Sequence, residues 1–249
     1  MNICVFDTET INLEKPFCYN IGYIIYNTEN HEKLIEKDFV IEQIWHNLPL
    51  FHTAYYAEKR PDYVIFMKRK VLKMKKIGSI TQEMIRDFKQ FNVKSAYAYN
   101  SDFDIRVFDF NCKWFKIINP FENLPVFDIR GYAHHFLTNC PEFEDFCEKY
   151  QYFTEAGNYS STAETIFRFI TNNPNFIEDH FALSDSQIEL EILKECINQR
   201  AKWGKVYSAK KSLTRKISSP LKIFIDNKIL HEGTFTKKYI TKGLYKFTT

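Results

Sequence analysis

Apolar and polar residues alternate along the chain in patterns that predict both strands and helices. Short apolar runs bounded by turn residues predict five strands. These strands lie at residues 2–7, 19–27, 34–42, 95–100 and 124–129. The first three follow one another closely, which indicates an antiparallel meander, and the other two alternate with helices. We therefore expect an α/β fold with a mixed five-stranded sheet, an antiparallel meander followed by parallel strands, flanked by helices.

Apolar residues at helical spacing predict the helices that flank this sheet. One helix covers residues 80–91, and another begins in the segment SDFDIRVFDF at residues 101–110. A late helix carries a capping box, with Ser184 as its N-cap and Gln187 three residues further on. This cap places Asp185 in the first turn of the late helix.

The charge is distributed unevenly along the 249 residues, whose net charge is +3. Residues 205–249 contain eleven Lys and Arg but two acids, a charge of +9, which leaves −6 for residues 1–204. We expect a domain at 1–204 and a basic extension at 205–249, with a hairpin turning at Asp226 and Asn227. The extension is predicted to contact nucleic acid or a protein partner, and a solvated lysine-rich tail is the alternative. Its candidate contact residues are Lys210, Lys211, Arg215 and Lys216.

The location predicted from the sequence is the cytoplasm. The start MNICVFDTET has no basic and apolar signal segment, and no apolar run approaches the ~18 residues of a membrane span. The six cysteines form no C-x-x-C pair. We therefore expect free thiols, no zinc site and no membrane partner.

The first candidate chemistry lies in VFDTET, where Asp7 and Glu9 end an apolar strand. Residues i and i+2 of a strand face the same way, so the two carboxylates lie about 7 Å apart along the backbone. Two such charges repel unless a cation separates them, and oxygen ligands favour Mg²⁺ or Mn²⁺. An ordinary strand end that enters a polar loop is the alternative.

Two further segments carry acids at the start of helices. In YNSDFDIRVF, Asp102 and Asp104 lie where a strand passes into a helix, a location that ligand sites of α/β sheets favour. In HFALSD, His180 precedes the helix in which Asp185 occupies the first turn. Each acid alone is also explained as a complement to the helix dipole.

The three segments together, in this order, resemble the DEDDh 3′–5′ exonucleases, whose fold is RNase H-like. The resemblance covers about residues 1–200. It implies that Asp7, Glu9, Asp104 and Asp185 bind two Mg²⁺ or Mn²⁺ ions and that His180 is the general base. It further implies that Asp7 bridges the metals, that Glu9 and Asp185 complete the water-activating site, and that Asp104 holds the second ion.

The resemblance also implies which residues meet the nucleic acid. Thr10 and Ile11 belong to the loop that meets the terminal nucleotide, and Asn100 and Phe103 match positions that flank the second motif. Asp128 matches a further acid for which no catalytic role is implied.

The chain departs from the family in three places. The segment TETIN stands where the family often continues with Thr and Gly, residues 45–76 have no match, and the basic extension lies outside the resemblance. Residues 45–76 contain KRKVLKMKK, a second basic cluster.

These observations predict a metal-dependent 3′–5′ exonuclease. It is expected to hydrolyse phosphodiester bonds at the 3′ ends of single-stranded nucleic acid, with DNA favoured over RNA, and to release nucleoside 5′-monophosphates. Two metal ions activate water and stabilise the charge of the transition state, and a histidine is suited to removing the proton from that water. The alternatives are RNA trimming of the oligoribonuclease kind and a non-catalytic nucleic-acid-binding module on the same fold.

Overall fold

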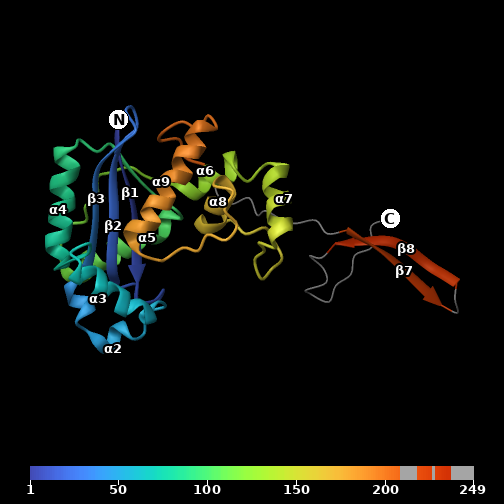
Figure 1. The fold of residues 1–249 in the computed structure, drawn as a ribbon, viewed down its shortest axis with the longest axis horizontal. Coiled ribbons are helices and arrows are strands. Elements are labelled where there is room, and N and C mark those ends of the chain that lie inside the picture. The colour runs from blue at the N-terminus through green and yellow to red at the C-terminus, as the bar shows by residue number, and fades with distance from the viewer. Residues whose placement is uncertain (208–217, 226–227, 237–249) are drawn as a thin grey trace.

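A mixed sheet of six strands forms the centre of the computed structural model (Figure 1). The strand order is β4-β3-β2-β1-β5-β6, with β2 antiparallel to both neighbours and the remaining pairs parallel. The strands are β1 (Asn2–Thr10), β2 (Cys18–Asn27), β3 (Glu32–Ile41), β4 (Lys73–Lys75), β5 (Ser95–Ala98) and β6 (Val126–Asp128). The predicted α/β class, with a meander followed by parallel strands, is confirmed.

The expected number of five strands was wrong by one, because β4 was not predicted. This strand has three residues, and its sequence KMK contains a single apolar side chain. It pairs in parallel with the end of β3, from Phe39 opposite Lys73 to Ile41 opposite Lys75. Backbone pairing at a sheet edge therefore makes the strand, and no alternation of side chains marks it in the sequence.

Helices cover both faces of the sheet (Figure 1). In chain order they are α1 (Glu42–Trp45), α2 (Leu48–Phe51), the 3₁₀ turn η1 (Ala57–Lys59), α3 (Arg60–Lys68), α4 (Ile77–Gln90), α5 (Ser101–Phe115), α6 (Ile129–Phe136), α7 (Pro141–Tyr150), α8 (Ala163–Ile170) and α9 (Ala182–Asn198). The predicted helix at 80–91 corresponds to α4, and its residues Ile80 and Met84 are fully buried.

The alternation of β1 divides the core into two clusters. Cys4 and Phe6 belong to one cluster, while Ile3 and Val5 belong to the other, which also contains Ile188 and Ile192 of α9. Since side chains two residues apart share a face, Asp7 and Glu9 continue the row of Ile3 and Val5. The two acids therefore lie on the face that α9 covers.

A glycine allows α9 to approach the sheet beside these acids. Gly22 of β2 is paired directly with Asp7 of β1. A Cβ atom on Gly22 would lie 2.1 Å from the backbone nitrogen of Leu183, a distance that no side chain tolerates. The hydroxyl of Ser186 also donates to the Gly22 carbonyl at 3.3 Å. The start of α9 is thus held against the strand position next to Asp7.

The structure describes residues 1–207, 218–225 and 228–236, with side chains for 1–207. Contacts with the body continue past the predicted boundary at 204, since the Tyr207 ring stacks on His135 at 4.6 Å. Strands β7 (Ser218–Ile225) and β8 (Lys228–Thr236) pair antiparallel, and the predicted turn at 226–227 lies outside the described residues. So do the four predicted contact residues Lys210, Lys211, Arg215 and Lys216.

Two expectations about the body can be compared with the described residues. All six cysteines are described, and each is a free thiol. Among the helices that the structure describes, none combines the length and the apolar character that crossing a membrane requires.

Candidate metal-binding active site

A pocket of about 270 Å³ opens at the carboxyl end of β1. Six of the predicted site residues line it, namely Asp7, Glu9, Thr10, Phe103, His180 and Asp185. They come from three separate parts of the chain: β1, the start of α5 and the start of α9. The fold therefore brings together segments that lie more than 170 residues apart in the sequence.

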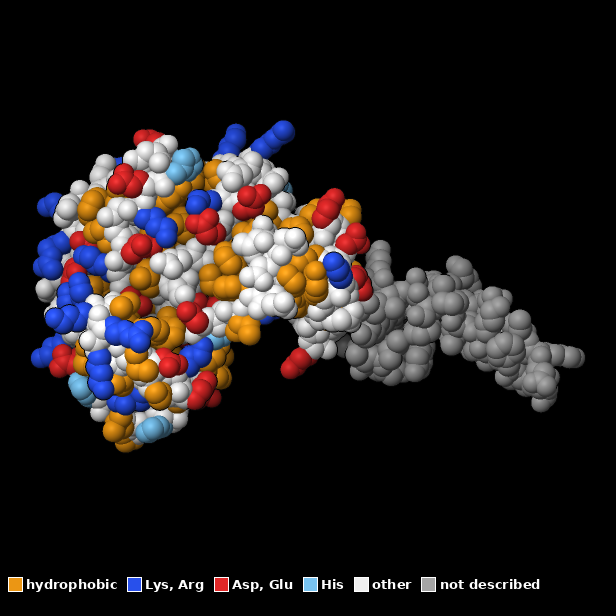
Figure 2. Space-filling view, in the orientation of Figure 1, with side chains coloured by type: hydrophobic (Ala, Val, Ile, Leu, Met, Phe, Trp, Pro, Cys, Tyr) orange, Lys and Arg blue, Asp and Glu red, His pale blue; other side chains and the backbone are white. Residues whose placement is uncertain are grey.

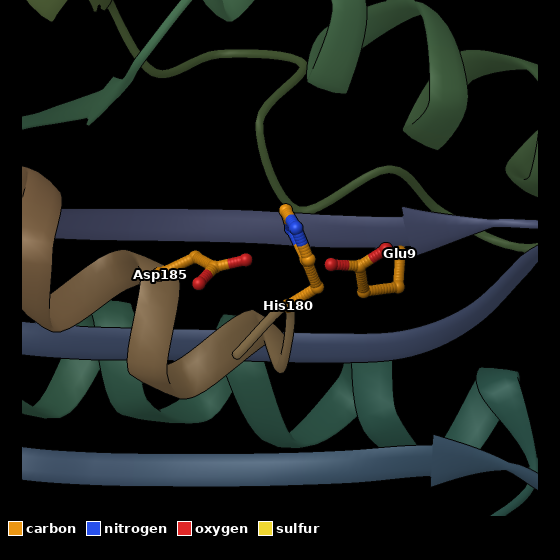
Figure 3. A group of neighbouring side chains, drawn as sticks. All are labelled: Glu9, His180 and Asp185. Carbon is orange, nitrogen blue, oxygen red and sulfur yellow. The ribbon is translucent and has the colours of Figure 1, made fainter. Parts of the chain in front are cut away.

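Glu9, His180 and Asp185 form the tightest group in the pocket. One ligand atom from each of the three side chains lies within 4.8 Å of the other two. The carboxylates of Glu9 and Asp185 point toward each other from either side of the His180 side chain (Figure 3). Two carboxylates and an imidazole at these separations are a donor set that a divalent cation accepts.

The start of α9 differs from the prediction, and the capping box at Ser184 was wrong. The helix begins at Ala182, and its N-cap residue, Phe181, makes no side-chain cap. The side chain of Asn20, from β2, accepts a hydrogen bond from the Ala182 N–H at 2.9 Å and thus satisfies one free donor of the helix start. A strand side chain replaces the local cap, and Asp185 still lies in the first turn.

Asp104 lies beside the pocket and contacts Thr8, the β1 residue between Asp7 and Glu9. Its Oδ1 accepts hydrogen bonds from the Thr8 hydroxyl at 2.7 Å and from the Thr8 N–H at 3.1 Å. The side chain is 2% exposed and does not contribute to the pocket lining. The second motif is therefore joined to the first through Thr8.

Two predicted contacts do not line the pocket. Ile11 is fully buried in the core, and its N–H donates to the Phe17 carbonyl at 2.9 Å, so its side chain cannot meet a nucleotide in this structure. Asn100 is exposed with a left-handed backbone (φ 64°), and its N–H donates to Asp128 Oδ1 at 2.9 Å. The same oxygen accepts the Arg130 N–H at 2.9 Å, so Asp128 joins the starts of α5 and α6.

Burial raises the pKa values of the acids in and beside the pocket. It raises the pKa of Glu9 to about 8 and that of Asp104 to about 7. Burial and the neighbouring charges of Glu178 and Glu9 raise the pKa of Asp185 to about 11. Burial and the charge of Asp104 raise the pKa of Asp7 well above its ordinary value. Without a cation, these carboxyl groups favour their neutral forms.

The acids also present buried oxygen atoms without hydrogen-bond partners. These atoms are Oδ2 of Asp7, Oδ1 of Asp185 and Oε2 of Glu189. Buried polar atoms are ordinarily satisfied, and a bound ion is one of the accepted explanations when they are not. Oxygen atoms in this arrangement fit a hard divalent cation such as Mg²⁺ or Mn²⁺.

His180 is held from the side by residues of the segment that had no family match. Its ring stacks on that of Tyr56, with centroids 4.2 Å apart and planes 14° from parallel. Lys59 lies 5.0 Å from the centre of the Tyr56 ring and donates to the Asp179 carbonyl at 2.5 Å. Burial, and then the positive charge of Lys59, lowers the pKa of His180. A neutral imidazole at neutral pH is the form that accepts a proton.

Sequence reasoning missed several residues of the pocket. Glu189 lies four residues after Asp185 in α9, is 3% exposed, and could have been found from the helical period. Glu178 also lines the pocket, and its Oε2 lies 3.9 Å from Nδ1 of His180. Tyr55 and Tyr56 come from the unmatched segment, where no sequence signal distinguishes them from the other tyrosines.

The fold of the chain is similar to that of solved exonuclease structures. E. coli exonuclease I in complex with a dT13 oligonucleotide matches with a TM-score of 0.52 at 15% identity, over 80% of this chain and 41% of that one. Exonuclease I in complex with the inhibitor BCBP gives 0.52 at 14% identity, over 80% and 42%. A structure of SSB/exonuclease I in complex with the inhibitor CFAM gives 0.51 at 13% identity, over 77% and 40%.

These comparisons show that the chain shares the fold of the solved exonuclease I structures. The chain spans about two fifths of the length of the solved structures that it matches. The sequence matches no protein-family profile and no curated protein.

Proposed function

We propose that the protein is a metal-dependent 3′–5′ exonuclease of the DEDDh type that acts on single-stranded nucleic acid. The observation that carries the proposal is the convergence of Asp7, Glu9, His180 and Asp185 in one pocket, with buried carboxylate oxygens that lack partners. The shared exonuclease fold supports it, because the pocket lies at the carboxyl end of a sheet strand, where ligand sites of α/β sheets occur.

The carboxylates would hold two Mg²⁺ or Mn²⁺ ions. Asp7, Glu9 and Asp185 would hold one ion, and Asp7 with Asp104 would hold the other. When bound, such ions lower the pKa of water and stabilise the charge on a transferring phosphate. Thr8 fixes the Asp104 carboxylate through two hydrogen bonds, which orients its second oxygen.

His180 would accept the proton from the attacking water. Its lowered pKa favours the neutral ring, and its exposed edge borders the pocket that holds the acids. The stacked Tyr56 ring restricts rotation of the imidazole about its side-chain bonds. A base held in one orientation contributes more to catalysis than one that rotates freely.

We propose DNA as the favoured substrate, since E. coli exonuclease I, with the same fold, is solved in complex with a dT13 oligonucleotide. The product would be nucleoside 5′-monophosphates released from the 3′ end. We further propose that residues 1–204 form the catalytic domain. The basic extension beyond it, with Lys210, Lys211, Arg215 and Lys216, would contact the nucleic acid or a protein partner.

The test uses single-stranded and duplex DNA and RNA labelled at the 5′ or the 3′ end, with Mg²⁺ or Mn²⁺. The proposal predicts stepwise shortening of 5′-labelled single strands, immediate release of a labelled mononucleotide from the 3′ end, and no hydrolysis with EDTA. Cleavage within the strand, or shortening from the 5′ end, would refute it. Faster hydrolysis of RNA than of DNA would refute the substrate preference alone.

A matched pair of variants tests the second motif. Asp104→Asn removes a buried carboxylate beside the pocket and should abolish hydrolysis, whereas Asp102→Asn changes an exposed acid two residues away and should leave it unchanged. The reverse result would show that the second motif is misassigned.

A further inference from the structure

Five cations form an exposed group that the proposed chemistry does not use. They are Lys68, Arg69, Lys70, Lys73 and Lys76, and we refer to them as the lysine ridge. They lie at the end of α3, in the following turn, in β4 and just before α4. Figure 2 shows basic side chains gathered on the side of the molecule that carries α3 and α4.

The ridge cations form no ion pairs with the described side chains, although Glu42 and Glu83 line a shallow pocket together with Lys76. Residues 63–82 contain no Asp or Glu, although residues 1–204 as a whole carry a charge of −6. Among the described side chains, none of the five ridge cations forms an ion pair or donates a side-chain hydrogen bond that fixes it. The neighbouring Lys75, by contrast, forms an ion pair with Glu83. The ridge is therefore a concentrated positive surface on an otherwise acidic body.

Sheet topology places the ridge at the same end of the sheet as the pocket. β1 and β3 are both antiparallel to β2, so their carboxyl ends lie together. β4 pairs with the last residues of β3, from Phe39 to Ile41. Three strand spacings separate β4 from β1, a distance of about 14 Å. The ridge and the pocket acids thus lie at the same end of the sheet.

Helix α3 connects the pocket to the ridge. Lys59, just before the helix, donates to the Asp179 carbonyl beside His180. The Tyr63 hydroxyl donates at 2.8 Å to the Asn20 oxygen that also receives the N–H of Ala182. The helix has nine residues and is about 13 Å long, and it ends at Lys68. One end of α3 is therefore anchored at the active site, and the other end presents the ridge.

The rim between pocket and ridge also exposes apolar surface. Tyr55 is 63% exposed and lines the pocket, Ile65 on α3 is 44% exposed, and Val71 within the ridge is 62% exposed. Surfaces that bind single strands combine cations for the phosphates with apolar and aromatic side chains for the bases. This combination does not suit a duplex, whose base faces are stacked inside.

We propose that the lysine ridge binds the phosphates of a single strand on the 5′ side of the nucleotides held in the pocket. This inference rests on the proposed function, because the strand must enter the pocket with its 3′ end. No lysine or arginine lines the pocket, so contacts to the further phosphates of a long substrate must come from cations elsewhere. The ridge supplies such cations about 14 Å from β1, where a nucleic-acid strand that leaves the pocket can reach them.

The experiment compares two triple variants with equal charge change. The ridge variant is Lys68→Gln, Arg69→Gln and Lys76→Gln, and the control is Lys113→Gln, Lys149→Gln and Lys202→Gln, three exposed lysines elsewhere on the body. Binding of long single-stranded oligodeoxynucleotides and oligoribonucleotides, and of duplex DNA of the same length, is measured in EDTA over a range of salt concentrations. Hydrolysis of a dinucleotide in Mn²⁺ is measured in parallel, and circular dichroism verifies folding.

The ridge variant should lower the slope of log K against log salt by about 2, since each phosphate contact on a single strand contributes about 0.7. The control variant should retain the wild-type slope, and both should hydrolyse the dinucleotide at the wild-type rate. An unchanged slope in the ridge variant, or an equally lowered slope in the control variant, would overturn the proposal that the ridge binds the strand. An equal loss of duplex affinity would overturn its assignment to single strands.

The ridge and the proposed function can fail separately. If the wild type binds single strands but hydrolyses none, and the ridge variant alone lowers the slope, the ridge is supported and the exonuclease proposal falls. If the wild type shortens 3′ ends, and the ridge variant binds single strands with the same salt dependence as the wild type, the exonuclease proposal is supported and the ridge proposal falls.

Discussion

Two groups of acids lie on opposite faces of the sheet and have different partners. On the α4 face, Lys37 lies 2.8 Å from Glu83 and 2.5 Å from Asp87. The Tyr23 hydroxyl also donates to Asp87 at 2.6 Å. Burial alone would raise the pKa of Glu83, but hydrogen bonds from Lys37 and Lys75 lower it. Both acids are paired within the protein.

On the α9 face, the pocket acids have no such partners. Among residues 1–207, no lysine or arginine forms an ion pair with Asp7, Glu9, Asp185 or Glu189. Lys59 is near enough for its charge to lower the pKa of Glu9, but its ammonium donates to a backbone carbonyl. The α4 face shows that this protein can pair buried acids with its own cations. The pocket is built differently, with room for a cation from solution.

The largest predicted contrast comes from removing one acid from each group. Asp185→Asn should reduce hydrolysis by more than about 100-fold, because losing a metal ligand costs at least as much as losing a residue that orients one. It should also raise the melting temperature of the metal-free protein, because a carboxyl group that is costly to bury is gone. Asp87→Asn should keep hydrolysis and destabilise the fold by about 1–3 kcal/mol, since Lys37 loses a charged partner.

The two readouts are initial rates in Mn²⁺ and thermal melting in EDTA. Destabilisation by both substitutions to the same extent would show that the pocket acids are structural, as those on the α4 face are.

The pH dependence of stability should differ between metal-free and metal-bound protein. The raised pKa values mean that Asp104 and Glu9 bind more protons in the folded, metal-free protein than in the unfolded chain. The contribution of these two groups to stability is therefore greatest below the ordinary carboxyl range. That contribution is lost as pH rises from about 4 through about 7 for Asp104 and about 8 for Glu9.

Mn²⁺ binds the ionised carboxylates, so its stabilising effect should grow over the same pH range. Melting curves at several pH values, with EDTA or Mn²⁺, measure both trends. A metal-free melting temperature that rises with pH through this window would contradict the account.

The smallest predicted contrast concerns the two lysines. Lys37→Met should lower stability by more than 1 kcal/mol, because it leaves Glu83 and Asp87 short of a partner. Lys59→Met should change stability by less than about 1 kcal/mol, as is usual for exposed charges near an acid. Denaturant unfolding measures both variants. Equal losses would mean that Lys59 is a structural counter-ion of the pocket after all.

The residues that sequence reasoning placed correctly are those governed by a local period. The two-residue period of β1 put Asp7 and Glu9 on one face. Asp185 lies in the first turn of α9 as expected, although the cap from which that position was predicted does not form. The capping box at Ser184 failed because Asn20, 162 residues from Ala182 in the chain, satisfies the helix start instead. Such long-range partners are set by packing and leave no local pattern.

The other pocket residues also divide into those that a local sequence pattern predicts and those that long-range packing places. Glu189 follows Asp185 by one helical turn, and its position on the pocket side was within reach of the sequence. Tyr56 was not, because its stacking on His180 depends on how α3 packs against the loop before α9. The burial of Ile11 likewise follows from the core that surrounds it, which the motif spacing does not show.

Calorimetric titration of Mn²⁺ into the wild type and into Asp7→Asn at neutral pH tests the central claim most directly. The account predicts binding of two ions to the wild type, with release of protons from the buried carboxyl groups, and loss of at least one site in Asp7→Asn while the variant stays folded. Absence of Mn²⁺ binding by the folded wild type, or identical binding by Asp7→Asn, would contradict it.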